Sequence, residues 1–514
     1  MSKTIIIIGA GLAGLSAALQ AAENACNVKL VSSLSSERAQ SVMAEGGINA
    51  ALNTKDENDS PEEHFTDTIK AACGLADPNA VWGMTQAAPE LVHWLLKLGV
   101  KFNMSGYDDV DLRNFGGQKK KRTAFAQSDT GKQIMTAMID AVRRKEASGM
   151  VERFSHHSFL TLRLCGNICC GCVIRDEYSQ ETVELPGDAV IVATGGMHGL
   201  FGNTTGSLSN TGEVTAELFR LGVPLANGEM IQYHPTTVKC GGKRMLISEA
   251  ARGEGGRLFA MKDGKQWYFM EEKYPELGNL MPRDITAREI WKVSHESEVF
   301  LDMTEISEEI ISNKLSGLAD DCMTYLHKDI RKEPVSVLPG IHYFMGGILV
   351  DEQHRTPIQN LYAAGECCAQ YHGANRLGGN SLLGALYGGR VAAKSACEQA
   401  DVVDLSCATQ IDFPPASQIS EIKQLNKVMQ ETMGVVRNEN TLLNGIQTVQ
   451  ALTGNLPLLG MAVLKSALAR KESRGAHWRE DYPKSNDDDY LKTTVARFDG
   501  KQIQISFVPV PERR

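Results

Sequence analysis

The chain has 514 residues, of which 42% are hydrophobic and 22% charged, as in a soluble globular protein with one large domain or several ordinary ones. Its net charge of −9 argues against nucleic acid as the main partner. No apolar run approaches the roughly 20 residues of a membrane span, and the N-terminus "MSKTIIIIGAG" lacks the ordered parts of a signal peptide. Twelve cysteines without a short secreted framework fit a reducing cytoplasm.

The first elements in chain order predict a βαβ unit. Residues 4–8 are a β-branched run that ends at a glycine, which is typical of a buried parallel strand. Residues 12–23 predict a helix, and residues 28–31 predict a second strand. The basic run at residues 119–122 is expected to lie in a solvated loop.

The rest of the chain divides into regions that differ in predicted secondary structure and in charge. Two more buried strands, residues 188–194 and 361–365, also end at glycines. Short strands joined by turns are expected between residues 153 and 184. Helical patterns occupy residues 62–72, 80–98 and 131–147. Charge rises and the elements become short and mixed between 235 and 340, and from about 418 the pattern is helical and then polar.

The stretch "GAGLAG" predicts a dinucleotide site. It places Gly9, Gly11 and Gly14 directly after a strand and at the start of a helix, where bare amides and the helix dipole favour a pyrophosphate. Ser32 and Ser33 stand at the end of the second strand, where a simple NAD dehydrogenase more often carries an acidic residue. This weakens the NAD interpretation but leaves a ribose contact by a hydroxyl open.

Three later glycine-containing positions favour a longer cofactor. They are Gly46–Gly47, Gly195–Gly196 and Gly365–Glu366, and at each one a ligand can pass close to the backbone. A ligand that touches four such places along the chain is longer than a nicotinamide cofactor, and this spacing suggests FAD.

The order of motifs along the chain resembles a known family, the flavoprotein subunits of succinate dehydrogenase and fumarate reductase, which also includes L-aspartate oxidase. The resemblance is nearest to the fumarate reductase flavoprotein. It rests on "GAGLAGLSAAL", "AEGGINAAL", "FGGQKKKRTAFAQSDTG", "QYHPT", "ISEAARGEGG", "MPRDITAR", "HYFMGGI", "HGANRLGGNSL" and "ESRGAHWREDYP". It implies an α/β fold: a Rossmann-like FAD-binding domain (residues 1–234 and 341–412), an inserted α+β capping domain (235–340) and a C-terminal helical domain (413–514).

The resemblance also implies a set of residues around FAD. These are Gly9, Gly11, Leu12, Ala13, Gly14, Ser32, Ser41, Gly46, Gly47, Ala193, Thr194, Gly195, Glu213, Glu366, Arg376, Ser381 and Leu382. Glu366 either binds the flavin ribose or only caps the next helix. Many membrane-bound members attach FAD through a histidine, and Gln40 stands at that place here. An amide cannot form the histidyl bond, so we expect non-covalent FAD and a bias toward fumarate reduction.

In this family a hydride moves between the flavin and a four-carbon dicarboxylate, and a proton is exchanged at the neighbouring carbon. Such a site needs cations for two carboxylates, a proton donor opposite the flavin and the exclusion of water. The resemblance implies that His234, Ser248, His342 and Arg376 bind the substrate carboxylates. It also implies that Phe115 packs on the carbon chain of the substrate.

Arg283 in "MPRD" matches the position of the family's general acid. A free guanidinium barely gives up its proton. Glu249 and Arg252, three residues apart in "EAAR", lie on one side of a helix or turn and form a relay that returns the proton. Arg283 and Arg376 could instead be ordinary ion-pair residues, and His372 could only orient its loop.

Two positions help to separate the relatives. Aspartate oxidases carry an acidic residue for the substrate ammonium where Phe115 stands, and a phenyl ring offers no such charge. Met345 in "HYFMGGI" is similar to fumarate reductases, where the oxidases more often have Cys. Fumarate/succinate chemistry is therefore favoured over aspartate oxidation and over another unsaturated or thiol-linked substrate. A non-catalytic flavin-binding assembly subunit is a further alternative, but it would not need all of these residues.

The stretch "CGNICCGC" has the spacing of an iron–sulphur site through Cys165, Cys169 and Cys172. Its strand-like surroundings favour a hairpin whose cysteines pack in an apolar layer, and we expect no metal site. The chain shows no haem-attachment motif. Electrons must then come from an iron–sulphur subunit, a soluble donor, or a thiol- or NADH-linked partner. We expect a cytoplasmic electron-transport protein without membrane insertion of its own, held at the inner membrane by partner subunits.

Overall fold

The computed structural model describes residues 2–401, 413 and 419–514. Its central sheet has the order β20-β10-β1-β2-β6, and every neighbouring pair in it is parallel. The strands are β1 (Thr4–Ile8), β2 (Asn27–Ser32), β6 (Val151–Ser155), β10 (Ala189–Val192) and β20 (Leu361–Ala363). Helix α1 (Leu12–Glu23) connects β1 to β2, which confirms the predicted βαβ unit.

The central sheet is covered on both faces, as continuous β-branched strands require. One face packs on α1, α3 (Pro78–Leu98), α4 (Thr130–Ala147) and α11 (Asn380–Gln399) in the largest apolar core. The other face meets a three-stranded sheet of β7 (His157–Cys165), β8 (Ile168–Asp176) and β9 (Thr182–Pro186). Cys169 and Cys172 are buried in this second core, in the hairpin that the sequence predicted.

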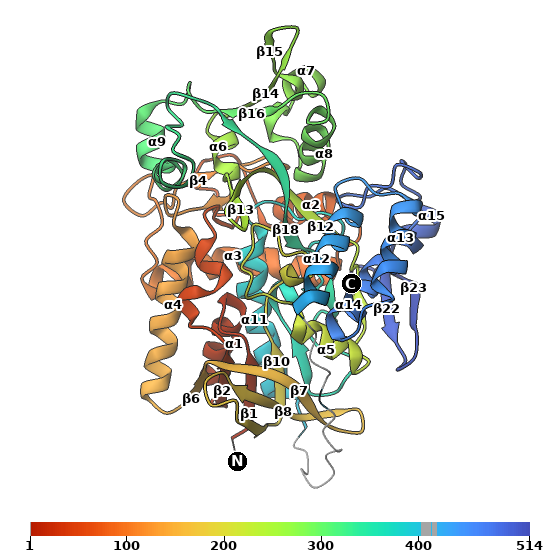
Figure 1. Cartoon of the computed structure of the whole chain (residues 1–514). Helices are drawn as coiled ribbons and strands as arrows, with labels where there is room; N and C mark the ends of the chain where they lie inside the picture. Colours follow the sequence, from red (N-terminus) through yellow and green to blue (C-terminus); the bar gives the residue numbers. More distant parts are fainter. Residues whose placement is uncertain (1, 402–412, 414–418) are drawn as a thin grey trace.

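Residues 231–344 form a group of elements whose helices and the sheet of β14 to β16 lie at the top of Figure 1, while β12 and β18 lie near the middle of the molecule. One sheet has the order β13-β12-β18 and another the order β15-β14-β16-β17. Their strands are β12 (Ile231–Cys240), β13 (Lys243–Leu246), β14 (Arg257–Lys262), β15 (Lys265–Trp267), β16 (Val299–Asp302), β17 (Val335–Ser336) and β18 (Leu338–Phe344). The helices are α6 (Glu249–Gly253), α7 (Phe269–Lys273), α8 (Arg283–Val293), α9 (Glu308–Lys314) and α10 (Ser316–Asp321). This region has its own apolar core, to which Phe115 contributes from outside.

The C-terminal region corrects one part of the prediction. It begins with three helices, α12 (Ile419–Thr432), α13 (Glu439–Val449) and α14 (Asn455–Ala469). It ends in a hairpin of β22 (Lys492–Phe498) and β23 (Ile503–Pro509), where the sequence analysis expected only helix and then a polar segment. In this hairpin β22 pairs with β11 (Leu225–Ala226), and β23 is the edge strand of a sheet with the order β21-β19-β11-β22-β23. The predicted domain boundary at 412 lies outside the described residues.

The remaining elements are short or peripheral. They are β3 (Ile48–Asn49), α2 (Pro61–Ala71), β4 (Leu112–Arg113), β5 (Thr123–Ala124), α5 (Glu213–Arg220), β19 (Gly347–Leu349), β21 (Cys368–Ala369) and α15 (Asp487–Tyr490). Throughout the part of the chain that the structure describes, every helix is too short or too polar to cross a membrane.

The basic run at residues 119–122 is only partly a solvated segment. Lys119 and Lys121 are exposed, but the Arg122 side chain is fully buried. Its guanidinium forms ion pairs with Asp59 at 2.8 Å and Asp67 at 2.9 Å. The two carboxylates explain how a charge can be held in the interior, and they lie too far away in the sequence to be recognised as its partners.

Candidate functional site

A cavity of about 1130 Å³ is lined both by the carboxyl ends of the central strands and by residues of the 231–344 region. Every residue that the sequence analysis placed at the cofactor or substrate lines this cavity, apart from Gly14, Gly196 and Arg252. Gly14 packs α1 on β1, because a Cβ there would lie 1.8 Å from the carbonyl oxygen of Gly9. Arg252 is buried behind Glu249.

The N-terminus of α1 forms one wall of the cavity. Gly11 is the N-cap and provides no side chain to cap the helix. The backbone N–H of Leu12 donates to the hydroxyl of Ser41 at 3.3 Å, which leaves the next amide, that of Ala13 in the cavity wall, for a ligand. Gly9 has φ +111°, and a Cβ there would lie 2.3 Å from the carbonyl oxygen of Ala193, so only glycine allows β1 and β10 to meet this closely. A Cβ on Gly11 would meet nothing closer than 3.8 Å and would project into the cavity.

These features fit a dinucleotide cofactor of the length of FAD. The amide of Ala13 and the helix dipole suit a pyrophosphate, and the glycines at 46, 47 and 195 line the path that leads from it toward the basic side chains. Gln40 also lines the cavity, and its Oε1 accepts a hydrogen bond of 2.5 Å from the backbone N–H of Ser207. Glu366 Oε1 accepts from the backbone N–H of Phe344 at 3.1 Å.

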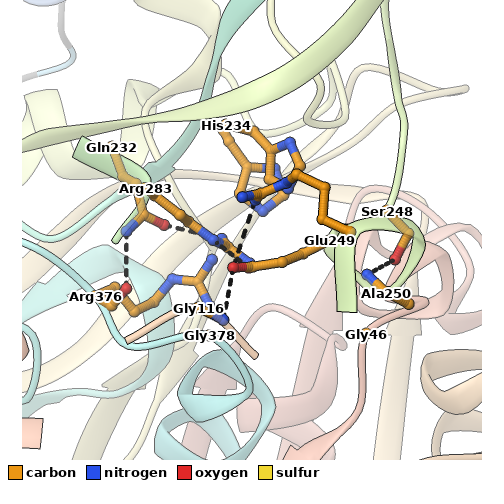
Figure 2. A network of polar contacts seen from close by, with 12 residues as sticks. Gly46, Gly116, Gln232, His234, Ser248, Glu249, Ala250, Arg283, Arg376 and Gly378 are labelled. Atoms are coloured by element: carbon orange, nitrogen blue, oxygen red, sulfur yellow. Dashed lines mark hydrogen bonds and ion pairs between the residues drawn. The ribbon is translucent and has the colours of Figure 1, made fainter. Parts of the chain in front are cut away.

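A network of polar contacts forms the opposite end of the cavity (Figure 2). Arg283 begins α8, and its Nε and Nη2 lie 2.7 and 2.6 Å from the same oxygen of Glu249, Oε2. Its Nη1 donates to Gln232 Oε1 at 3.0 Å. Gln232 in turn donates from its amide nitrogen to the backbone oxygen of Arg376 at 2.9 Å. All three nitrogens of the Arg283 guanidinium therefore have fixed partners.

Glu249 connects Arg283 with Arg252. Its second oxygen, Oε1, accepts from the backbone N–H of Gly116 at 3.0 Å and lies 3.5 Å from Nη2 of Arg252. Burial on its own would raise the pKa of Glu249, but the two guanidinium groups and the hydrogen bonds outweigh it, so the pKa lies below its ordinary value. The carboxylate is ionised at neutral pH and lies between the two guanidinium groups.

Two imidazoles, His234 and His342, lie side by side with ring centroids 5.2 Å apart. Burial, and then the positive charge of Arg283, lowers the pKa of each ring well below its ordinary value. Both rings are therefore neutral at pH 7. His342 Nδ1 is 2.8 Å from the hydroxyl of Thr205, and this contact fixes the orientation of the ring.

Arg376 follows a loop and lies over the ring of Tyr343, with 4.3 Å between its guanidinium carbon and the ring centroid. Burial, and then the nearby charge of Arg283, lowers the pKa of Arg376 to about 9. Its buried Nε has no hydrogen-bond partner within the described part of the chain, and Arg376 lines the cavity. A buried cation without an anion is costly, so this geometry is suited to a negatively charged ligand.

The other predicted substrate residues have different surroundings. The hydroxyl of Ser248 caps α6 by accepting from the backbone N–H of Ala250 at 3.4 Å, and the side chain also borders the cavity. Phe115 is 2% exposed and lies beside Gly46, where a Cβ would come within 3.0 Å of its ring. His372 does not line the cavity and packs edge-on against Tyr343, at 5.3 Å between the ring centroids, which supports its role as a loop residue.

Sequence reasoning missed four side chains of this site: Gln232, Thr205, Tyr343 and Glu45. Each of the first three contacts a predicted residue: Gln232 contacts Arg283, Thr205 contacts His342, and Tyr343 contacts Arg376. Gln232 and Tyr343 also lie inside motifs quoted above. Glu45 lines the cavity, and burial, followed by the charge of Asp321, raises its pKa to about 8. The motif "AEGG" is the one sequence signal that could have drawn attention to Glu45. Its acidic neighbour, Asp321, is too distant in the sequence to be recognised.

The comparisons with known proteins agree with this geometry. Residues 4–382 match the family model of an FAD binding domain, and residues 452–513 match the model of a fumarate reductase flavoprotein C-terminal region. The succinate dehydrogenase flavoprotein subunit of Bacillus subtilis is 37% identical, covering 100% of this chain and 98% of the relative. The 8-methylmenaquinol:fumarate reductase flavoprotein subunit of Wolinella succinogenes is 32% identical over 100% of this chain and 92% of the relative.

Solved structures show the same likeness. A variant of FrdA from E. coli quinol fumarate reductase superposes with a TM-score of 0.90 at 27% identity, covering 99% of this chain and 97% of that chain. A parallel Rossmann-like sheet, an FAD-binding domain and a matching C-terminal region are thus shared along the whole length. The chain belongs to the family of succinate dehydrogenase and fumarate reductase flavoprotein subunits and is an FAD-dependent oxidoreductase of that family.

Proposed function

We propose that this flavoprotein interconverts fumarate and succinate and that it is biased toward fumarate reduction. The observation that carries the proposal is the convergence of Arg283, Arg376, His234 and His342 on one end of the cavity, opposite the end that suits a pyrophosphate. Two guanidinium groups and two neutral imidazoles there match the two carboxylates of a small dianion. Relatives of both activities support the substrate pair.

Substrate binding is assigned to the groups that have unused hydrogen-bonding capacity. Arg376 brings a positive charge and a buried Nε without a partner, and it is the principal carboxylate ligand. His342 and His234 each have N–H capacity as neutral rings, and Ser248 borders the same end of the cavity. Burial strengthens each of these contacts, because water does not compete for the dianion.

Proton transfer is assigned to Arg283. Its Nε and Nη2 hold Glu249 Oε2, and Glu249 in turn lies 3.5 Å from Arg252, so a proton that Arg283 gives to a substrate carbon can be replaced along this row. When bound, FAD supplies the hydride donor and acceptor for the reaction. Fixed partners on all three guanidinium nitrogens keep the donor in one orientation, which is what proton transfer in a buried site requires.

Gln40 supports non-covalent FAD and a bias toward fumarate reduction. Its amide is held by the backbone of Ser207 and cannot form the histidyl link of the membrane-bound relatives. The resemblance associates that link with succinate oxidation. We expect FAD absorbance to appear in the supernatant after acid precipitation, and yellow colour that stays with the precipitate would contradict the proposal.

L-aspartate oxidation is the alternative that the family leaves open. Phe115 borders the substrate end with an apolar ring and offers no anion to an ammonium group, so it disfavours this alternative. Initial rates with fumarate and a reduced dye, compared with rates for L-aspartate and oxygen, separate the two. Fumarate-dependent dye oxidation is the expected result, and hydrogen peroxide formed from aspartate would refute our choice.

An electron partner completes the proposal. The chain's relatives are flavoprotein subunits, and we assign an iron–sulphur subunit as the first candidate donor, before a soluble, thiol- or NADH-linked one. The location proposed is cytoplasmic, at the inner membrane through such partners. Affinity purification from the native cells, followed by identification of the co-purified chains, tests this: recovery of the flavoprotein without an iron–sulphur chain would exclude the first candidate.

A further inference from the structure

The motif "ESRGAHWREDYP" has no role in the proposed mechanism. Its middle residues nevertheless contact both the loop that carries Arg376 and the helix α8, which begins with Arg283. We name residues 474–478 the brace. On one side the brace contacts the loop that carries Arg376: the backbone N–H of Ala476 donates to the carbonyl oxygen of Ala374 at 2.9 Å. Gly475 has φ +54°, and a Cβ there would lie 2.5 Å from the same oxygen, so only glycine allows this close approach.

On its other side the brace contacts α8, the helix that begins with Arg283. The guanidinium of Arg288 lies over the ring of Trp478, with 4.1 Å from its carbon to the ring centroid. Within residues 2–401, 413 and 419–514, no hydrogen bond or ion pair joins the Arg288 side chain to another residue. Arg288 also interacts electrostatically with Asp284 on the same helix, and the ring of Trp478 is the contact that joins Arg288 to the brace.

The brace itself is held rigidly. Arg474 pairs with Glu472 at 2.8 Å, and its Nη1 donates to the carbonyl oxygen of Cys73 at 3.1 Å. The backbone N–H of Arg437 donates to the carbonyl oxygen of Trp478 at 3.0 Å. Buried charges with fixed partners on both sides leave the segment little freedom to move.

We propose that the brace sets the position of Arg283 relative to Arg376. Trp478 is a positioning residue for α8 and acts through Arg288, while Gly475 and Ala476 position the Arg376 loop. The inference rests on the proposed function in one respect, the assignment of proton transfer to Arg283 and of carboxylate binding to Arg376. It adds that the C-terminal region, which contributes no residue to the cavity lining, controls both groups.

The two halves of the brace predict different kinetic effects. Trp478→Ala frees α8, so we expect kcat with fumarate to fall about tenfold while the Kd of malonate, a dianion that is not turned over, changes less than about twofold. Trp478→Phe keeps an aromatic face for Arg288 and restores most of kcat. Gly475→Ala pushes on Ala374 and should weaken malonate binding about tenfold.

Hydrogen–deuterium exchange of the full-length holoenzyme provides a readout that does not depend on turnover. In Trp478→Ala the amides of α8 should exchange faster, while the amides of Ala374 and Ala476 remain protected, because their hydrogen bonds to the carbonyl oxygens of Ala72 and Ala374 are retained. Gly475→Ala should show the reverse pattern. Trp82 is the matched control: it stacks under Arg513 at 3.9 Å but does not line the cavity, so Trp82→Ala should leave kcat, the Kd of malonate and α8 exchange unchanged.

Unchanged exchange in α8 for Trp478→Ala would overturn the inference, and so would equal effects from Trp82→Ala or a Phe variant that behaves like Ala. Arg288→Gln removes the same contact from the other side and must reproduce the Trp478→Ala pattern, which keeps the test decisive if that variant folds poorly. Faster α8 exchange in a protein that does not reduce fumarate would refute the proposed function and leave the brace supported.

Discussion

Replacing Glu249 by Gln tests the centre of the site, because the change removes one charge and almost no volume. The amide oxygen can take the place of Oε2 and keep the contacts with Arg283. The amide nitrogen then takes the place of Oε1, where it faces the backbone N–H of Gly116 and Nη2 of Arg252. The new amide N–H groups would then face two other hydrogen-bond donors. The fully buried Arg252 would also lose its only nearby anion among the described residues.

The size of the effect follows from this loss. Removal of one partner from a buried ion pair lowers the free energy of unfolding by about 3–5 kcal/mol. The unfolding entropy of a chain of 514 residues is about 1.1 kcal/mol/K, so the thermal midpoint should fall by about 3–5 °C. If Glu249 also returns the proton to Arg283, kcat should fall by a factor of about 10² to 10⁴.

The pH dependence gives a second signature. The folded-state pKa of Glu249 is lowered, so its contribution to stability is present above the unfolded value of 4.5 and is lost as the pH falls through the folded-state pKa. The difference in thermal midpoint between wild type and Glu249→Gln should therefore be constant from pH 6 to 8 and shrink below about pH 4.5. Thermal scans across this range measure it.

Asp351→Asn is the matched control. Arg355 places Nε and Nη2 on one oxygen of Asp351, both at 2.7 Å, as Arg283 does with Glu249, but the Asp351 side chain is 41% exposed and that of Glu249 1%. An exposed pair contributes at most about 1 kcal/mol, so this variant should keep its thermal midpoint within about 1 °C and its full activity. Equal losses in the two variants, or a fully active Glu249→Gln, would refute the reasoning.

Three more changes test neighbouring parts of the argument. Arg376→Lys keeps the charge but loses the planar fork, so KM for fumarate should rise about 10- to 100-fold in steady-state assays, and an unchanged KM would contradict carboxylate binding. His342 is neutral in the fold because its pKa is depressed, so acid below the unfolded value of about 6.5 destabilises the ligand-free protein, and His342→Gln should flatten this decline in thermal scans from pH 7 to 5. Arg122→Met leaves Asp59 and Asp67 buried without a cation and should cost about 3–5 kcal/mol in denaturant unfolding, with little change in KM; a loss below about 1 kcal/mol would show that these charges do not stabilise the fold.

The sequence predicted those parts of the molecule that depend on local pattern. Residues 4–8 and 12–23 appear at the expected positions because the β-branched run, the glycines and the helical spacing act within a few residues. The cavity residues came from motif order, and their convergence could not be calculated from spacing alone.

Long-range pairing explains what was missed. Arg122 follows three lysines, so it was predicted to lie with them in a solvated loop. Its buried partners Asp59 and Asp67 are separated from it in the sequence by more than one secondary-structure element. The strand β23 has a clear alternation in its burial, but the partner sheet that makes it a strand is built from residues near 225 and 348. Gln232 is one amide in a strand until the fold brings Arg283 and Arg376 to either side of it.

The sheet of order β21-β19-β11-β22-β23 draws two of its strands from residues 492–509, at the far end of the chain. Strand β11 pairs with β19 on one side, but its partner on the other side, β22, is far away in the sequence, and the backbone N–H of Asn227, just beyond β11, donates to the carbonyl oxygen of Thr494. Truncation of this hairpin would therefore leave one edge of β11 unpaired, so its effect should reach a sheet whose other strands include those near residues 225 and 348.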